Sequence, residues 1–223
     1  MVRAFCCVLC VAFLLLFSGC AAYTATQPHT GVVLIDPGHG GFDGGTVAID
    51  GTNEKHINLS ISLMLRDMLA VCGVAVDLTR DTDAALEDAS AVSIREKKVS
   101  DMRNRLTMYA TADLVISIHQ NHFSVPKYHG TQVFYSDNHP DSRLLATSIR
   151  ASVIRRLQPE NTRELKKASD GIYLLHHTTV PAVLVECGFL SNPDELERLK
   201  DVVYQQKTAW TILLGYWDYT IQK

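Results

Sequence analysis

The segment Val32-Val33-Leu34-Ile35-Asp36-Pro37-Gly38-His39-Gly40-Gly41 carries most of the information about the fold of this chain. An aliphatic run that stops at Pro-Gly predicts a buried strand entering a tight loop. Within that loop, little side-chain bulk surrounds His39, so a ligand can approach the imidazole closely. Loops at strand ends are where open α/β sheets build their sites. Taken alone, the segment is equally consistent with a turn that presents a histidine to solvent.

The composition is that of one folded domain. Of the 223 residues, 47% are hydrophobic and 20% are charged, which is typical of a globular protein with a sizeable core. The net charge is −3 and the sequence has no basic run, so nucleic acid is not expected as a partner.

The N-terminus predicts export. Residues 1–22 hold Arg3 and then an uncharged apolar run from Ala4 to Phe17, which is shorter than the roughly 20 residues of a membrane span and typical of a secretory signal. Phe17-Ser18-Gly19-Cys20 resembles a bacterial lipobox, except that Phe stands where Leu is usual. We therefore expect a signal peptide, with lipidation at Cys20, or an uncleaved signal anchor. Either would tether an exported protein to the membrane. A polar linker, residues 23–30, and a folded domain, residues 31–223, follow.

Cysteine usage agrees with this division, because four of the six cysteines lie in the leader. Cys72 and Cys187 remain in the domain. Both are expected to be buried, since one lies late in a predicted helix and the other on an apolar strand. A single pair is no disulfide framework, and whether the two pair is left open. No cluster of cysteines predicts a thiolate zinc site.

Strands and helices alternate along the domain, which predicts a single α/β domain with a largely parallel sheet. The predicted strands are Val32–Ile35, Val74–Thr79, Leu114–His119, Thr131–Tyr135 and Ala182–Cys187. A first helix begins at Glu54, with Asn53 as its N-cap, and ends at Gly73. The other predicted helices are Ile94–Ala110, Asp141–Leu157 and Asp194–Ile221.

Four polar residues stand at the ends of these elements. His39, His119 and Glu186 follow apolar strands, and Glu54 opens a helix. If the strands are parallel, their carboxyl ends meet at one edge of the sheet, where the first three side chains converge. Two histidines and a carboxylate around a metal leave a fourth position for water, as in catalytic zinc sites. A further carboxylate outside the ligand set can take that water's proton.

Each residue also has a simpler explanation. Taken alone, a histidine on an apolar strand, such as His119, is more often a hydrogen-bonded core histidine than a metal ligand. Glu54 in the first turn of a helix suits the positive end of the helix dipole. Glu186 is harder to explain in this way, because a carboxylate at the end of Pro181-Ala182-Val183-Leu184-Val185 is costly to bury without a partner.

The domain resembles the zinc-dependent N-acetylmuramoyl-L-alanine amidases, the type-three amidase family, from Val32 to about Tyr219. The matching segments, in the same order and spacing, are Leu34-Ile35-Asp36-Pro37-Gly38-His39-Gly40-Gly41, Glu54-Lys55-His56-Ile57-Asn58-Leu59, Leu78-Thr79-Arg80, Ser117-Ile118-His119-Gln120-Asn121 and Pro181-Ala182-Val183-Leu184-Val185-Glu186-Cys187-Gly188-Phe189-Leu190-Ser191-Asn192. The resemblance implies a twisted, mostly parallel sheet flanked by helices, of the phosphorylase/hydrolase-like type, and makes residues 31–223 the catalytic domain.

By that resemblance, one Zn²⁺ is bound by His39, Glu54 and His119, and Glu186 is the catalytic acid and base. The implied reaction hydrolyses the amide between N-acetylmuramic acid and the L-alanine of the peptidoglycan stem peptide. Asp36 and Asn121 flank ligands and are candidates for orienting them, although ordinary turn or strand-end hydrogen bonding explains them equally well. Arg105 lies where the family tends to carry arginine, so a substrate or a structural role is open.

Further segments resemble the spore-cortex subgroup, which takes part in germination by stripping stem peptides to form muramic-δ-lactam. They are Ile94–Arg105, Gln132–Tyr135 and Gly171–Leu175. Only Ser136 to Pro140 stands where some relatives insert a blocking helix, so control by a regulatory lipoprotein partner or by expression is expected. The enzyme would then act outside the membrane, in a periplasm-like or forespore intermembrane space. A general cell-wall turnover or division amidase, a metallo-carboxypeptidase and an inactive peptidoglycan-binding module are the alternatives. The fifteen-residue spacing from His39 to Glu54 argues against the carboxypeptidase.

Overall fold

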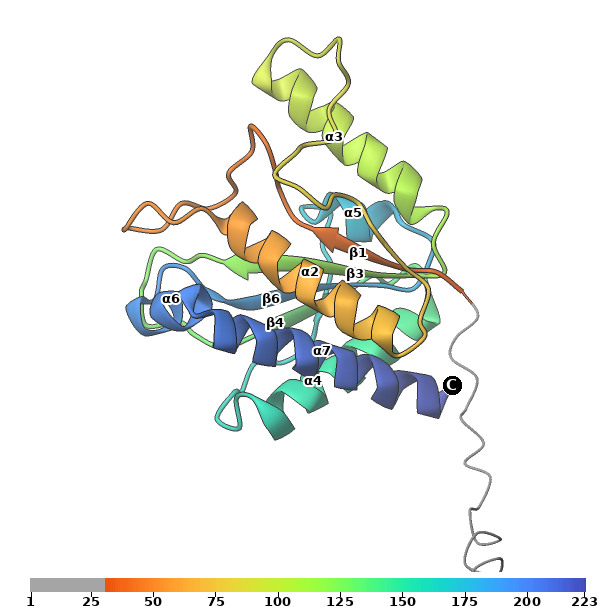
Figure 1. Cartoon of the computed structure of the whole chain (residues 1–223), viewed down its shortest axis with the longest axis vertical. Coiled ribbons are helices and arrows are strands. Elements are labelled where there is room, and N and C mark those ends of the chain that lie inside the picture. The colour runs from red at the N-terminus through yellow and green to blue at the C-terminus, as the bar shows by residue number, and fades with distance from the viewer. Residues whose placement is uncertain (1–30) are drawn as a thin grey trace, which may run out of the picture.

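The computed structural model describes residues 31–223 as an α/β domain in which helices cover both faces of a six-stranded sheet (Figure 1). The predicted leader, residues 1–22, and the linker, residues 23–30, lie outside the described residues. Within residues 31–223, no helix is long and apolar enough to cross a membrane.

The sheet has the order β2-β1-β3-β6-β4-β5. Its strands are β1 (Val33–Pro37), β2 (Val76–Leu78), β3 (Leu114–Asn121), β4 (Gln132–Tyr135), β5 (Lys166–Lys167) and β6 (Ala182–Phe189). The first four strands in that order are mutually parallel, whereas β4 runs antiparallel to β6 and β5 runs parallel to β4. The prediction of a mostly parallel sheet is confirmed, with one reversal between β6 and β4.

The helices are α2 (Glu54–Val71), α3 (Ile94–Tyr109), α4 (Pro140–Arg156), α5 (Tyr173–His177), α6 (Pro193–Lys200) and α7 (Val202–Gln222). The single helix predicted over Asp194–Ile221 is wrong, because Asp201 adopts an extended conformation and separates α6 from α7. Its side chain accepts a hydrogen bond from the Val203 amide and thereby caps the second helix. Asn53 precedes α2 as predicted but makes no side-chain capping bond.

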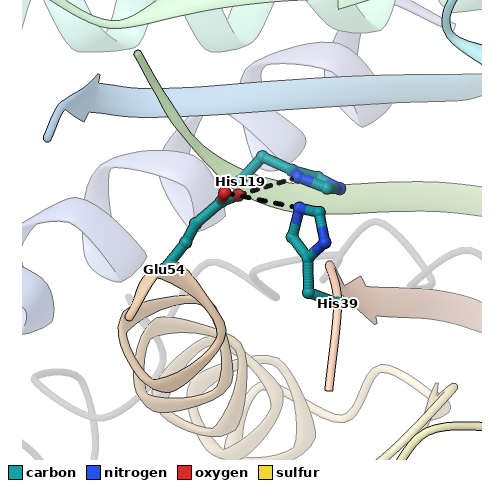
Figure 2. Close-up of side chains that lie close together, drawn as sticks. All are labelled: His39, Glu54 and His119. Carbon is teal, nitrogen blue, oxygen red and sulfur yellow. Dashed lines mark hydrogen bonds and ion pairs between the residues drawn. The ribbon is translucent and has the colours of Figure 1, made fainter. Parts of the chain in front are cut away.

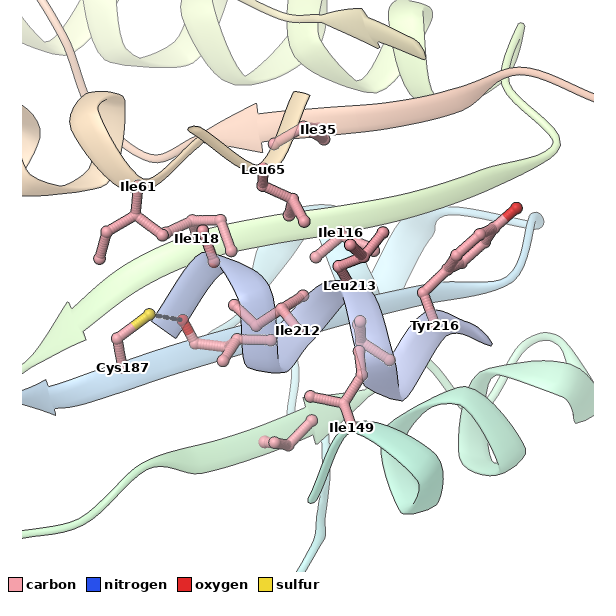
Figure 3. Packing of buried hydrophobic residues seen from close by; sticks show 14 of the residues in the cluster. Ile35, Ile61, Leu65, Ile116, Ile118, Ile149, Cys187, Ile212, Leu213 and Tyr216 are labelled. Carbon is pink, nitrogen blue, oxygen red and sulfur yellow. Dashed lines mark hydrogen bonds between the residues drawn. The ribbon is translucent and has the colours of Figure 1, made fainter. Parts of the chain in front are cut away.

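The larger core lies between the sheet and the helices α2, α4 and α7 (Figure 3). Alternate strand residues point into it, since successive side chains of a strand face opposite sides. Ile35, Ile116 and Ile118 meet Ile61 and Leu65 of α2, while Ile149 of α4 packs with Ile212 and Leu213 of α7. The buried residues of α2 recur with helical spacing, as the sequence predicts.

The opposite face of the sheet carries a thinner apolar layer under α3 and α5. Leu34, Val115 and Ala182 pack there with Tyr109 of α3 and Leu174 of α5. Because this layer is small, the same face has room for polar residues near the carboxyl ends of the strands.

The two cysteines differ in their surroundings. Cys187 is buried as predicted, but the prediction for Cys72 is wrong, because α2 ends at Val71 and Cys72 is exposed at its C-cap. Both thiols are free within the part of the chain that the structure describes.

Candidate metal centre

Three side chains from distant parts of the sequence meet at the carboxyl edge of the parallel strands (Figure 2). His39 follows β1, His119 lies near the end of β3, and Glu54 is the first residue of α2. Each offers one ligand atom, and these atoms all lie within 4.8 Å of one another. The convergence that the parallel order predicts is therefore present.

The Glu54 carboxylate lies at the centre of this group. Its Oε2 is 3.3 Å from His39 Nε2, and its Oε1 is 3.0 Å from His119 Nδ1. Its side chain is only 3% exposed, against 25% and 20% for the two histidines. Its hydrogen bonds from backbone amides come from Thr46 and Gln120, on other elements, so the carboxylate is not engaged in capping its own helix.

The loop between β1 and α2 has backbone conformations and glycines that leave room for the three side chains. His39 has a φ of 62°, a left-handed conformation that non-glycine residues rarely adopt and that clusters at functional sites. A Cβ on Gly38 would lie 2.2 Å from the His119 ring. Gly45 has a φ of +67°, and a Cβ there would lie 2.6 Å from Glu54 Oε2. These glycines let the loop close tightly around the carboxylate and the imidazoles.

The charges of His39, Glu54 and His119 depend on one another. Burial opposes the charged form of His39, but hydrogen bonds to Asp43 and Glu54 outweigh it and raise the pKa of His39 to about 9. Burial also opposes ionisation of Glu54, yet hydrogen bonds from His119 and His39 hold the pKa of that carboxyl well below its usual range. The carboxylate is thus ionised and requires positive charge beside it, which a proton or a metal ion can supply.

Glu186 lies beside this group without belonging to it. It pairs with His119 across β3 and β6, so both side chains point to the same face of the sheet. Among the described residues, its Oε2 is buried and has no hydrogen-bond partner. Burial raises the pKa of Glu186 to about 7. It lines a cavity of about 250 Å³ together with His39, His119, Met102 and Tyr173.

The donor set fits a zinc ion. Two imidazole nitrogens and one carboxylate oxygen are the three protein ligands of a common catalytic zinc arrangement, which keeps a further position open. The partial exposure of both histidines leaves that position accessible from the cavity. The buried Glu186 oxygen without a partner lies on the same side, where a polar group would complete it.

Asp36 and Arg105 form a buried support beneath the His39 loop. Asp36 accepts hydrogen bonds from Thr79 and Tyr109 and pairs with Arg105 at 2.5 Å. Arg105 Nη2 donates to the His39 carbonyl at 2.7 Å, so this arginine holds the backbone of the loop.

Asn121 ends β3, and its side chain accepts a hydrogen bond from the His122 amide. Within the described residues its side chain makes no hydrogen bond to His39, Glu54 or His119. This hydrogen bond to the His122 amide supports a role for Asn121 in strand-end hydrogen bonding and not in orienting a ligand.

Three residues that orient His39 and Glu54 through hydrogen bonds were not predicted from the sequence. Asp43 Oδ2 lies 2.8 Å from His39 Nδ1, which turns Nε2 toward Glu54. Asn58 donates to Glu54 Oε1 at 3.1 Å and to the Gly38 carbonyl, and the Gln120 side chain donates to Asn58. A signal for Asn58 was available: it lies four residues after Glu54, on the buried face of the same helix.

A sequence model of N-acetylmuramoyl-L-alanine amidases matches residues 33–216, which is most of the chain and contains every residue of the site. The chain belongs to this amidase family. Its enzymatic activity is accordingly hydrolysis of the amide between N-acetylmuramic acid and L-alanine in peptidoglycan.

Named relatives agree with the assignment to the amidase family. The germination-specific N-acetylmuramoyl-L-alanine amidase of Bacillus subtilis is 36% identical over 194 residues, covering 86% of this chain and 81% of the relative. The AmiA amidase of Escherichia coli is 26% identical, covering 84% of this chain and 75% of AmiA. Among solved structures, the CwlD amidase of Clostridioides difficile, in complex with the GerS lipoprotein, superposes with a TM-score of 0.83 at 38% identity, covering 86% of this chain and all of that one.

Proposed function

We propose that this amidase uses one zinc ion held by His39, Glu54 and His119, with Glu186 as its general base and acid. The observation that carries the proposal is the position of Glu186. Its carboxyl group lies beside the three-residue group, and within the described residues its buried Oε2 has no hydrogen-bond partner. A carboxylate in that position is free to bind the attacking water.

A zinc ion bound there would polarise the scissile carbonyl and acidify a water molecule. Glu186 accepts the proton of the attacking water through Oε2 and delivers it to the departing L-alanine nitrogen, which would otherwise leave as an unstable anion. Asp43 holds the His39 ring by its Nδ1 and thereby fixes the direction of Nε2. Asn58 and the Gln120 amide hold Glu54 Oε1 in the same way.

Replacing His119 with alanine should abolish both zinc binding and cleavage. The variant keeps the buried Glu54 carboxylate but loses one of the three ligand atoms, so the zinc content after dialysis should fall from about one ion per chain to near zero. His122→Ala is the matched control, because His122 is exposed three residues further on. Zinc retention by the His119 variant, measured by atomic emission, would remove His119 from the ligand set.

We further propose a role in spore-cortex maturation, with export and membrane tethering through residues 1–22, followed by the linker 23–30. The similarity to a germination-specific amidase supports the cortex role. The similarity to an amidase solved with a lipoprotein supports a lipoprotein partner. The site would then act on peptidoglycan outside the membrane.

The products formed from isolated cell-wall material test this role. We expect free stem peptides that begin with intact L-alanine, identified by mass spectrometry, and loss of muramic-δ-lactam from the cortex when the gene is deleted. Normal lactam content in the deletion strain would instead favour a general turnover amidase. Full activity of the purified enzyme with zinc alone would argue against an obligatory lipoprotein partner.

A further inference from the structure

A second, cationic cavity opens on the same face of the sheet as the metal centre. It has a volume of about 380 Å³ and is lined by Gln132 of β4 and by residues of the two segments that flank that strand, 127–129 and 161–166. Gln132 pairs with Glu186 across β4 and β6. Directly paired residues of an antiparallel ladder project to the same side, so this cavity begins one strand beyond Glu186.

Three cations line the cavity: Lys127, Arg163 and Lys166. Within residues 31–223, none of the three has a carboxylate within 4.0 Å. The acid in the lining, Glu164, is 84% exposed and pairs with Arg150 instead. The cavity therefore presents an excess of unpaired positive charge.

Arg163 is held in place for binding an anion. Its Nε donates to the His129 carbonyl at 2.6 Å, and its guanidinium lies 4.3 Å from the centre of the Phe189 ring. Burial lowers the pKa of Arg163, while the charge of Glu195 opposes that shift. Glu195 is itself bound by the Phe189 and Gly130 amides. An arginine fixed through Nε and by stacking keeps its terminal nitrogens for a carboxylate, at a small entropic cost.

We propose that this cavity binds the α-carboxylate of the second residue of the stem peptide, and the carboxylate of the third where one is present. This inference rests on the proposed function, which places the L-alanine nitrogen beside Glu186. In the stem peptide, the amino group of D-glutamate is joined to L-alanine and its γ-carboxyl is joined to the third residue, which leaves its α-carboxylate free. The cavity would then select acidic stems over stems amidated at that position.

The distances allow this path. Neighbouring strands are about 4.8 Å apart, so β4 and β5 lie about 5 and 10 Å beyond Glu186. An extended peptide advances roughly 3.3–3.6 Å per residue, so the second and third residues reach that range. Gln132 lies between the two sites but is 2% exposed, and its side chain donates to the Glu164 carbonyl, so the peptide would pass over the segment that carries Glu164 and not contact Gln132 directly.

Binding of the dipeptide L-alanyl-D-glutamate tests the cavity without requiring catalysis. The full-length protein loaded with zinc is titrated with this dipeptide and with its α-amide, L-alanyl-D-isoglutamine, by calorimetry or NMR. We expect about tenfold tighter binding of the acid, and a loss of that preference in Arg163→Gln and Lys166→Gln. Arg155→Gln is the control, because Arg155 is an exposed arginine of α4 that pairs with Asp218.

Cleavage of glycan strands that carry the two stems provides the second measurement. We expect a lower KM for the acidic stem, with a similar kcat, and equal KM values for the two stems in Arg163→Gln. Equal affinity and equal KM for acid and amide in the wild-type protein would contradict the proposed binding of the α-carboxylate in the cavity while leaving the amidase function intact. Preferential binding of the acidic dipeptide without any cleavage of glycan strands would contradict the proposed reaction and still support the proposed role of the cavity.

Discussion

Replacing Glu186 with glutamine should lower kcat for amide cleavage by about 10²–10⁴-fold while zinc stays bound. Glutamine has nearly the same shape but cannot accept and return the proton that the reaction moves. Glu186 lies outside the group formed by His39, Glu54 and His119, so the ion should not depend on it. The variant also removes an ionisable group from a buried position, so its fold should be at least as stable as that of the wild type.

Release of stem peptides from purified peptidoglycan measures kcat, and metal analysis after dialysis measures zinc. Glu197→Gln is the matched control, because that carboxylate is 74% exposed on α6 and pairs with Lys200. A Glu186→Gln enzyme with the wild-type rate would contradict the assigned role. Loss of zinc together with activity would place Glu186 among the ligands instead.

The sequence predicts the central sheet well because each buried strand is a short aliphatic run with clear limits. It does not predict β5, whose two residues, Lys166 and Lys167, are exposed and carry no apolar pattern. It also merges α6 and α7, because the residues on either side of Asp201 are all compatible with a helix. Local propensity cannot show that one residue leaves the helix to cap the next.

The sequence likewise predicts one part of the site and not another. His39, His119 and Glu186 follow apolar strands, so a parallel sheet alone brings them to one edge. The contacts that orient them depend on tertiary structure. Asp43 reaches His39 only because the loop turns back at a left-handed residue, and Gln120 reaches Asn58 only because β3 lies beside α2. No periodicity in the sequence encodes the loop conformation behind the first contact or the packing of two elements behind the second.

Replacing Arg105 with methionine should lower the free energy of unfolding by about 3–5 kcal/mol, because it leaves Asp36 as an uncompensated buried charge. Arg105 is 2% exposed and joins Asp36 to Asp101 of its own helix. Burial opposes ionisation of Asp36, but the Arg105 guanidinium outweighs it and holds the pKa of that carboxyl well below its usual range. Because the folded-state pKa is depressed, this contribution is present above pH 4 and is lost as the pH falls through the folded value.

Urea denaturation of Arg105→Met at pH 7 measures the loss, and Arg103→Met is the matched control. Arg103 lies on the same helix, but its side chain is 60% exposed and pairs with Asp88 at the surface, so its removal should cost less than about 1 kcal/mol. A second substitution, Asp36→Asn, should recover part of the stability of the Arg105 variant, because it removes the unpaired charge. It should not recover activity, since the bond from Arg105 to the His39 carbonyl is still missing and the loop that carries His39 loses its support. Recovery of both would mean that Arg105 acts only through its charge, and recovery of neither would mean that its packing against β1 is the dominant contribution.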